Sequence, residues 1–210
     1  MATNTNVARG LIPYAHYDGS VWNGSGNIYY VAAGYTAANI YIGDPLTIHS
    51  ASNDANGIPA VQLGVTGSPI IGVMLGIVDG GPFAATTITV TRDLPTYHTL
   101  GTAQYILVSD DPTLLYLVQD DASSNTAFAP QLWAGKNANF VSGSGNTTTG
   151  YSGYQLAASG VATTNTLDLK IIRPLNSADN LIGTTTNTNM NAKWLVKLNN
   201  YQYANQEAGG

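Results

Sequence analysis

Two pairs of adjacent aspartates are the residues of this sequence whose type and spacing come closest to a chemical site. Asp110-Asp111 and Asp120-Asp121 lie in the stretch YILVSDDPTLLYLVQDD, and together they are four of the chain's twelve acidic residues. Two carboxylates within roughly 5–10 Å of each other can serve as the acid and the base of a glycosidase. Clustered carboxylates can also bind Ca²⁺. The distance between the two pairs therefore decides whether either chemistry applies.

The residues around the first pair are arranged as two strands and a turn. Residues 105–109 and 114–119 are runs of strand-forming residues, and residues 110–113, DDPT, have Asp and Pro at positions that favour a turn. This pattern predicts a β-hairpin. At about 3.3 Å per residue, the second strand separates the two pairs by about 20 Å, which is too far for a shared site. We therefore interpret the aspartates as turn and strand-end residues that make at most surface contacts.

Other metal and catalytic patterns are weak in the sequence. No stretch matches the D-x-[DN]-x-[DN]-G calcium loop, so calcium binding would require a surface loop that combines Asp120 or Asp121 with backbone carbonyls. His16, His49 and His98 lie on separate segments without the close spacing of a metal-binding pair. A fold that gathered a histidine and an aspartate would instead give a small hydrolase.

Nucleophile and nucleotide motifs are missing from the sequence as well. The serines offer no G-x-S-x-G elbow, and neither a Walker loop nor a G-x-G-x-x-G motif occurs. The chain has no cysteine, which removes thiol catalysis, thiolate zinc sites and disulfides together. We predict that the protein is not an enzyme and needs no cofactor.

The composition narrows the classes of partner. Charged residues make up 9% of the chain, against about 25% in ordinary soluble domains, and the net charge is −5. The basic residues are scattered, so nucleic acid is not an expected partner. They are Arg9, Arg92, Lys136, Lys170, Arg173, Lys193 and Lys197. The longest apolar run, residues 69–78, is far shorter than the roughly 20 residues of a membrane helix, and no secretory signal is visible. We expect a soluble protein that does not bind membranes.

Hydrophobic residues recur mostly at every second position, which predicts strands. In KWLVKL, Trp194, Val196 and Leu198 share one face, and both lysines lie on the other. Strands are predicted in the same way at residues 27–33, 39–43, 45–50, 70–78, 86–91, 153–159 and 167–172, and short helices could cover 123–133 and 176–183. Turn clusters between the strands, with 23 glycines and 9 prolines, predict an all-β fold: a β-sandwich, jelly roll or barrel-like single domain.

The predicted domain spans residues 13–203, with an extended arm at each end. The N-terminal arm, residues 1–12, and the flexible C-terminal tail, residues 204–210, have too little apolar surface to pack on their own. We expect them to be disordered or ordered by a neighbour. Residues 183–192, GTTTNTNMNA, form a polar loop that is long enough to reach another subunit.

Tyrosine is the residue type that best indicates a contact surface. The chain has 13 tyrosines, and this side chain combines a large contact area with a polar tip, as at interfaces with proteins and sugars. Several tyrosines lie near the two ends of the chain. The residues that we predict to bind a partner are Arg9, Leu11, Ile12, Tyr14, Trp22, Tyr201 and Tyr203.

The order of segments along the chain resembles a group of small structural proteins of tailed bacteriophages that are encoded near the major capsid protein. The segments that carry this resemblance are RGLIPYAHYDGSVWNGS, YIGDPLTI, IIGVMLGIV, YILVSDDPTLLYLVQDD, NANFVSGSGNTTTGYSG and NAKWLVKLNN. Proteins of this group resemble capsid decoration, or cement, proteins. The resemblance spans nearly the whole chain but rests on its general pattern, and no site motif maps residue by residue.

The resemblance implies a β-rich, non-enzymatic decoration protein that binds the major capsid protein and stabilises the outer capsid lattice. Such a protein would be a homo-oligomer on the capsid surface of the virion, after synthesis in the host cytoplasm. A weakly charged surface suits contacts that depend little on salt, and many copies on one lattice gain affinity by avidity. The alternative is a carbohydrate-binding β-sandwich on a virion surface or tail, with Trp22 or Tyr151 stacking on sugar rings.

Overall fold

The structure, a computed structural model, describes residues 4–78, 95–122, 132–182 and 190–204. In these ranges the regular elements are strands in antiparallel sheets, apart from short 3-10 turns such as Ser50–Ser52, so the predicted all-β class is confirmed. The predicted strand 86–91, most of the helix predicted at 123–133 and nearly all of the tail 204–210 lie outside the described residues. No helix in the described ranges is long and apolar enough to span a membrane.

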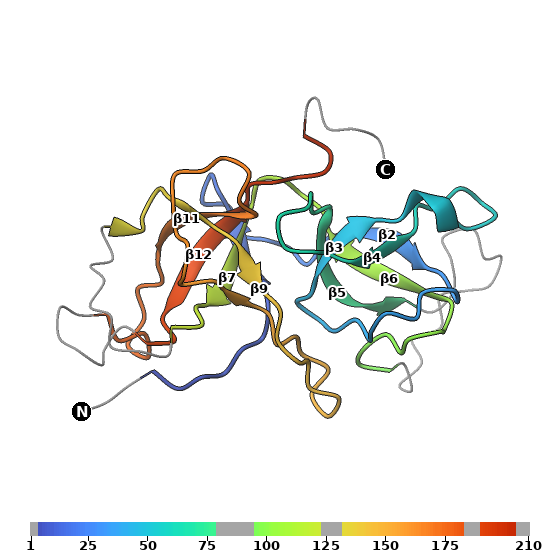
Figure 1. Ribbon diagram of the computed structural model, residues 1–210, viewed down its shortest axis with the longest axis horizontal. Coiled ribbons are helices and arrows are strands. Elements are labelled where there is room, and N and C mark those ends of the chain that lie inside the picture. Colours follow the sequence, from blue (N-terminus) through green and yellow to red (C-terminus); the bar gives the residue numbers. More distant parts are fainter. Residues whose placement is uncertain (1–3, 79–94, 123–131, 183–189, 205–210) are drawn as a thin grey trace.

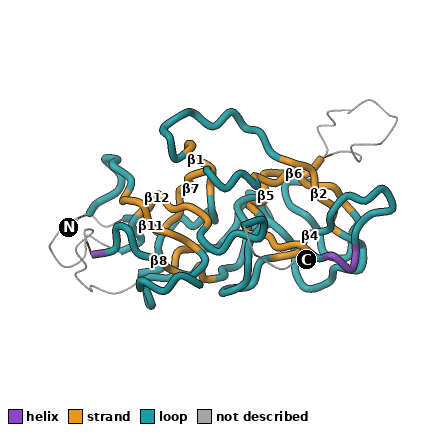
Figure 2. The backbone as a smooth tube through the Cα atoms, turned by 90° about the horizontal axis from the view of Figure 1, so that it is seen from above, coloured by secondary structure: helices purple, strands orange, loops and turns teal. Residues whose placement is uncertain are grey.

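Two five-stranded antiparallel sheets contain most of the strand residues of the described structure, and they lie at opposite ends of the long axis (Figures 1 and 2). The first sheet has the order β1 (Ile12–His16), β7 (Leu114–Gln119), β12 (Lys193–Leu198), β11 (Leu169–Pro174) and β8 (Asn137–Ala138). The second has the order β2 (Asn27–Val31), β6 (Gln104–Ser109), β5 (Gly72–Val78), β3 (Pro45–Ile48) and β4 (Val61–Leu63). A smaller pair joins β10 (Gln155–Leu156) to β9 (Phe140–Val141).

Each large sheet packs one face against its own hydrophobic core. Alternation along β12 places Trp194 and Val196 in the first core, as predicted, while Lys193 and Lys197 lie on the opposite face. We call that opposite face the outer face of the first sheet. The first core also contains Leu11, Tyr116, Phe140, Leu156, Leu169 and Ile171, and the second contains Val31, Ile40, Leu46, Ile71, Met74, Ile106 and Val108.

Most of the predicted strands form, but their lengths and partners differ in places. Residues 39–43, predicted as a strand, make only isolated bridges through Ile40 and Ile42. Residues 176–182, predicted as a helix, are irregular apart from a turn at 178–179. β5 supplies side chains to both cores, because the consecutive residues Val73 and Met74 point to opposite faces. A bulge between Met74 and Gly76 then shifts its register with β6.

The hairpin predicted for β6 and β7 is wrong, although both strands form. β6 lies between β2 and β5, and β7 lies between β1 and β12, so consecutive strands belong to different sheets. Residues 110–113 do turn, because Thr113 N donates a hydrogen bond of 2.7 Å to Asp111 Oδ1. The alternation of side chains identifies a strand but not its partner, so a crossover between sheets has the same local pattern as a hairpin.

Two tyrosine hydroxyls fasten this crossover at the junction of the sheets. Tyr116 Oη donates to the carbonyl oxygen of Ser109 at 3.0 Å, and Tyr201 Oη donates to the carbonyl oxygen of Asp110 at 2.5 Å. Tyr201 and Leu63 also pack against both hydrophobic cores. The two sheets are therefore joined by packing and by hydrogen bonds as well as by the chain itself.

The N-terminal segment, residues 4–11, is held by the chain's own domain rather than by a neighbour. Asn4 is buried, and its side-chain amide donates to the carbonyl oxygens of Leu181 and Met190 at 3.1 and 2.9 Å. The oxygen of the same side chain accepts a 2.7 Å hydrogen bond from Leu181 N. Val7 N donates to Gln119 Oε1 at 2.8 Å. The sequence does not indicate this docking because polar groups, not an apolar stripe, hold the segment.

A close backbone contact bends the N-terminal segment toward the second sheet. Leu11 N donates to the carbonyl oxygen of Gly43 at 2.9 Å. Gly10 has φ +69°, and a Cβ there would lie 2.3 Å from that oxygen, so only glycine fits. The bend directs Leu11, which is 1% exposed, into the first core.

Replacement of Asn4 tests this docking directly. We expect Asn4→Ala to lower the free energy of unfolding by about 1–3 kcal/mol, because three backbone groups, two of Leu181 and one of Met190, lose their hydrogen bonds to the buried Asn4 side chain. Asn6→Ala is the matched control: Asn6 is exposed, and its change should stay within about 0.5 kcal/mol. Urea denaturation of both variants measures the difference. Equal stabilities would contradict the docked segment.

Candidate interaction surface

β1 is an edge strand, and it displays large apolar and aromatic side chains to solvent together with the turn that follows it. It pairs with β7 on one side, and the chain then turns back, with His16 N donating to the carbonyl oxygen of Ser20 at 2.9 Å. Tyr14 is 48% exposed, Tyr17 is 62% exposed and Val21 is 85% exposed. We call these three residues the β1 surface. Exposed edges that bear aromatic side chains are common sites of protein contact.

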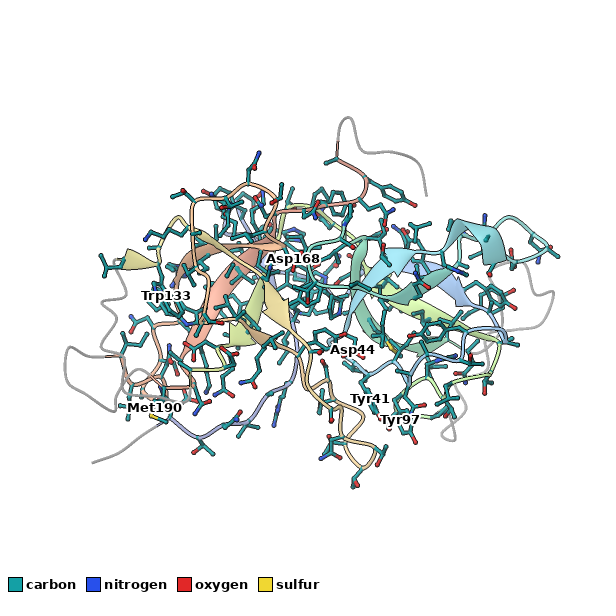
Figure 3. All side chains as sticks on the ribbon, viewed as in Figure 1. Tyr41, Asp44, Tyr97, Trp133, Asp168 and Met190 are labelled. Carbon is teal, nitrogen blue, oxygen red and sulfur yellow. The ribbon has the colours of Figure 1, made fainter. Side chains whose placement is uncertain are left out.

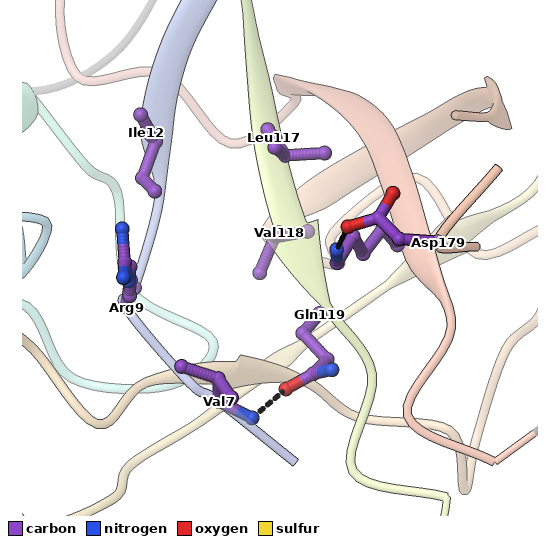
Figure 4. Close-up of a pocket in the computed structure, with 9 residues that line it drawn as sticks. Val7, Arg9, Ile12, Leu117, Val118, Gln119 and Asp179 are labelled. Carbon is purple, nitrogen blue, oxygen red and sulfur yellow. Dashed lines mark hydrogen bonds and ion pairs between the residues drawn. The ribbon is translucent and has the colours of Figure 1, made fainter. Parts of the chain in front are cut away.

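A pocket of about 350 Å³ lies beside β1, between the N-terminal segment and the first sheet (Figure 4). Figure 4 shows Val7, Arg9 and Ile12 on one side and Leu117 and Gln119 of β7 on the other. The remaining residues that line it are Gly10, Val118, Asp179 and Lys193. Because Lys193 belongs to the outer face of the first sheet, the pocket opens on that face.

The β1 surface extends onto the same outer face. The ammonium group of Lys197 lies 5.8 Å from the ring centroid of Tyr17, a cation–π distance. Lys193 and Lys197 occupy one face of β12, so Tyr17 and the pocket lie over the same side of the first sheet. This side therefore combines aromatic, aliphatic and cationic groups.

The predicted partner-binding residues fall into two groups. Arg9, Ile12 and Tyr14 lie together along the N-terminal segment and β1, with Arg9 and Tyr14 exposed and Ile12 half-buried in the pocket wall. Leu11 was predicted as a contact residue, and the structure corrects this: the bend at Gly10 turns Leu11 into the first core, where it is buried.

The other predicted contacts lie away from the pocket. Trp22 is half-buried against the first core, and its indole N–H donates to the carbonyl oxygen of Ser25 at 3.2 Å. Tyr201 belongs to the junction of the sheets, whereas Tyr203 is 55% exposed. Val21, which the prediction omitted, is the most exposed of the large hydrophobic residues in the described ranges. No local sequence pattern marks Val21, because it lies outside the regular strands.

Asp120 is buried, which corrects its predicted role as a surface residue. It is 0% exposed, and its two oxygens accept hydrogen bonds from Ala192 N at 3.1 Å and from the Trp194 indole N–H at 2.9 Å. Burial raises the pKa of the Asp120 carboxyl to about 7, and the Trp194 and backbone donors act in the opposite direction. These N–H donors occupy the oxygens that a calcium ion would need.

Two more aspartates are buried as acceptors for backbone N–H groups. Asp44 accepts from Tyr41 N at 2.7 Å, and Asp168 accepts from Gly67 N at 2.9 Å. Burial raises the pKa of each carboxyl to about 6, against the effect of these hydrogen bonds. Figure 3 shows Asp44 and Asp168 at separate positions near the middle of the molecule, so they do not pair as an acid and a base.

The first aspartate pair and the histidines also have separate structural contacts. Asp110 accepts from the Tyr29 hydroxyl at 2.8 Å, and Asp111 lies 3.4 Å from Nδ1 of His16. His98 is fully buried, with Nε2 2.8 Å from the carbonyl oxygen of Thr102. Among the described residues, no three or more acidic or histidine side chains are grouped to hold a metal ion.

A second hollow lies between the loops of the two sheets. Two adjoining cavities of about 350 and 340 Å³ share Leu63, Ser142 and Tyr154. Their other lining residues are mainly aromatic, hydroxyl and amide side chains and glycines: Tyr35, Tyr41, Asn39, Gln62, Thr66, Ser144, Gly64, Gly143 and Gly145. Asp44 at its edge is the one charged residue that lines this hollow within the described part of the chain.

Comparison with protein-family models, with curated proteins and with solved structures finds no match to this chain.

Because three carboxyl groups are buried, we predict that the protein becomes more stable as the pH falls from 8 to about 5. A carboxyl whose pKa is raised on folding contributes stability below its unfolded value of 3.8, and this contribution is lost as the pH rises through 6 to 7. We expect the free energy of unfolding to increase by more than about 1 kcal/mol from pH 8 to pH 5. Urea denaturation at the two pH values measures it.

Asp120→Asn should remove about half of this pH dependence, because between pH 8 and pH 5 the carboxyl with a pKa of about 7 contributes about as much as the two with a pKa of about 6 together. Asp18→Asn is the control: a hydrogen bond from Ser20 lowers the pKa of Asp18, so its titration falls below this window. A wild-type protein that is equally stable at pH 5 and pH 8 would contradict the assignment.

Proposed function

We propose that the chain is a non-enzymatic structural protein of a virion, a decoration protein that binds the major capsid protein on the outer lattice of a tailed phage. The observation that carries this proposal is the β1 surface, in which Tyr14, Tyr17 and Val21 are exposed on the edge of a five-stranded sheet. The resemblance of the segment order to phage structural proteins supports it. In this proposal the protein acts as a homo-oligomer on the capsid surface.

The physical chemistry of the β1 surface fits a protein partner. A fully covered tyrosine buries about 150–250 Å², and aromatic residues of this kind often carry most of the energy of an interface. Rigidity also supports the proposal. Because β1 is paired with β7, its backbone loses little conformational freedom when a partner binds. A modest single contact is sufficient because many copies bind one lattice.

Substitution of the two tyrosines tests the proposal. We expect the Tyr14→Ser/Tyr17→Ser variant to bind capsids that lack the protein at least about tenfold more weakly than the wild type, since two aromatic anchors are lost. Leu100→Ser is the control, because Leu100 is 46% exposed in a loop next to the second sheet. Co-sedimentation with purified capsids measures binding. Equal binding of both variants would contradict the assignment of the β1 surface.

Saccharide binding is a second candidate, favoured by the hollow between the sheets. Tyrosine rings, hydroxyls and amides are the groups that recognise neutral sugars. We expect Gln62→Ala to abolish binding on a glycan array if the hollow is the site, whereas Tyr151→Ala should abolish it if the exposed aromatic residues are the site. A wild-type protein that binds no glycan would remove this candidate.

A further inference from the structure

The pocket beside β1 is a fixed feature of the fold. At one end Val7 N is bound to Gln119 Oε1, and at the other Ile12 pairs with Leu117. Between these points the chain leaves β7, because the contact of Gly10 with Gly43 holds it away. Both ends of the gap are fastened, so it does not close without breaking hydrogen bonds or pairing.

The charges around the pocket leave one cation without an acidic partner. Within the described part of the chain, the ion pairs are His16 with Asp111 and Lys193 with Asp179. Lys193 and Asp179 line the pocket and neutralise each other. Arg9 lines it as well, and its guanidinium carbon lies 5.2 Å from the ring centroid of Tyr151.

The contact with Tyr151 orients the guanidinium of Arg9 but does not use its hydrogen-bond donors. A ring face attracts the positive charge, whereas the N–H groups of the guanidinium lie in its plane. These groups match the two oxygens of a carboxylate in a bidentate pair. The aliphatic wall of Val7, Ile12 and Leu117 suits the neighbouring carbon atoms of such a ligand.

We propose that this pocket receives an aspartate or glutamate side chain from an extended segment of the protein partner, with Arg9 binding its carboxylate. This inference rests on the proposed function, since it names the chemistry by which the capsid subunit is recognised. The chain has a net charge of −5, so attraction of an acidic group requires a local cation, and Arg9 supplies it at the edge of the β1 surface. The contact would then fix the register of a partner that packs on Tyr14 and Tyr17.

Capsid binding by Arg9 variants tests the proposal. Arg9→Met should weaken co-sedimentation with capsids that lack the protein by about tenfold or more, the range of a lost charge-assisted hydrogen bond. The capsid binding of Arg9→Lys should fall between that of the wild type and that of Arg9→Met, because an ammonium group keeps the charge but cannot bind a carboxylate in the bidentate manner. Arg173→Met is the matched control: Arg173 is exposed on β11 and does not line the pocket, so binding should change by less than about twofold.

A peptide titration separates this inference from the proposed function. The probe is N-acetyl-Leu-Glu-Leu-amide, with the Gln peptide as its uncharged counterpart, and the readout is the amide NMR shifts of Ile12 and Leu117. Shifts that only the Glu peptide causes, and that Arg9→Met removes, support the pocket even if capsids are not bound. If capsids bind wild type, Arg9→Met and Arg173→Met equally, or if neither peptide causes shifts, the pocket assignment is overturned.

Discussion

The crossover at residues 110–113 is the constraint on which the rest of the structure depends. It sends β6 and β7, which are adjacent in the chain, into different sheets, and each strand then lies between two partners in its own sheet. The protein therefore has two hydrophobic cores, and the junction between them needs side chains that pack against both cores and hydrogen bonds that hold the crossover in place. Tyr116, Tyr201 and Leu63 do this, the tyrosines through hydrogen bonds to the crossover and its flanking residue. The bend of the N-terminal segment is a further link, because it joins Leu11 N to Gly43.

Aspartate serves this fold mainly as an acceptor for N–H groups that the strands leave unpaired. Asp44, Asp120 and Asp168 are almost completely buried, and each receives backbone N–H groups from loops or strand ends. A buried unpaired N–H is costly, so these carboxylates stabilise irregular chain that connects short strands, even though burial raises their pKa. Their use in the interior is consistent with a chain in which charge is scarce on the surface.

Much of the fold could be predicted from residue patterns, and the remainder depends on long-range contacts. Alternation in β12 identified its core face correctly, because one-sided burial imposes a period of two. The partner of β7 could not be predicted, since strand pairing depends on segments that are distant in sequence. Asp120 was placed on the surface because the predicted hairpin made it a strand-end residue, whereas Trp194, 74 residues away, supplies its partner.

The candidate site was predictable only in part for the same reason. Tyr14 and Arg9 have residue types that indicate contact surfaces, and both are exposed. The pocket could not be predicted, because it exists through a bend at Gly10 and a hydrogen bond between Val7 and Gln119, residues 112 positions apart. The sequence around Gly10 does not indicate that this residue packs against the backbone of Gly43.

Electron cryo-microscopy of purified capsids tests the central claim most directly. The account predicts that the protein is present at a fixed ratio to the major capsid protein, with its two-sheet body on the outer surface and the β1 surface against the capsid. Capsids that lack the protein, or density in which β1 faces solvent, would contradict it.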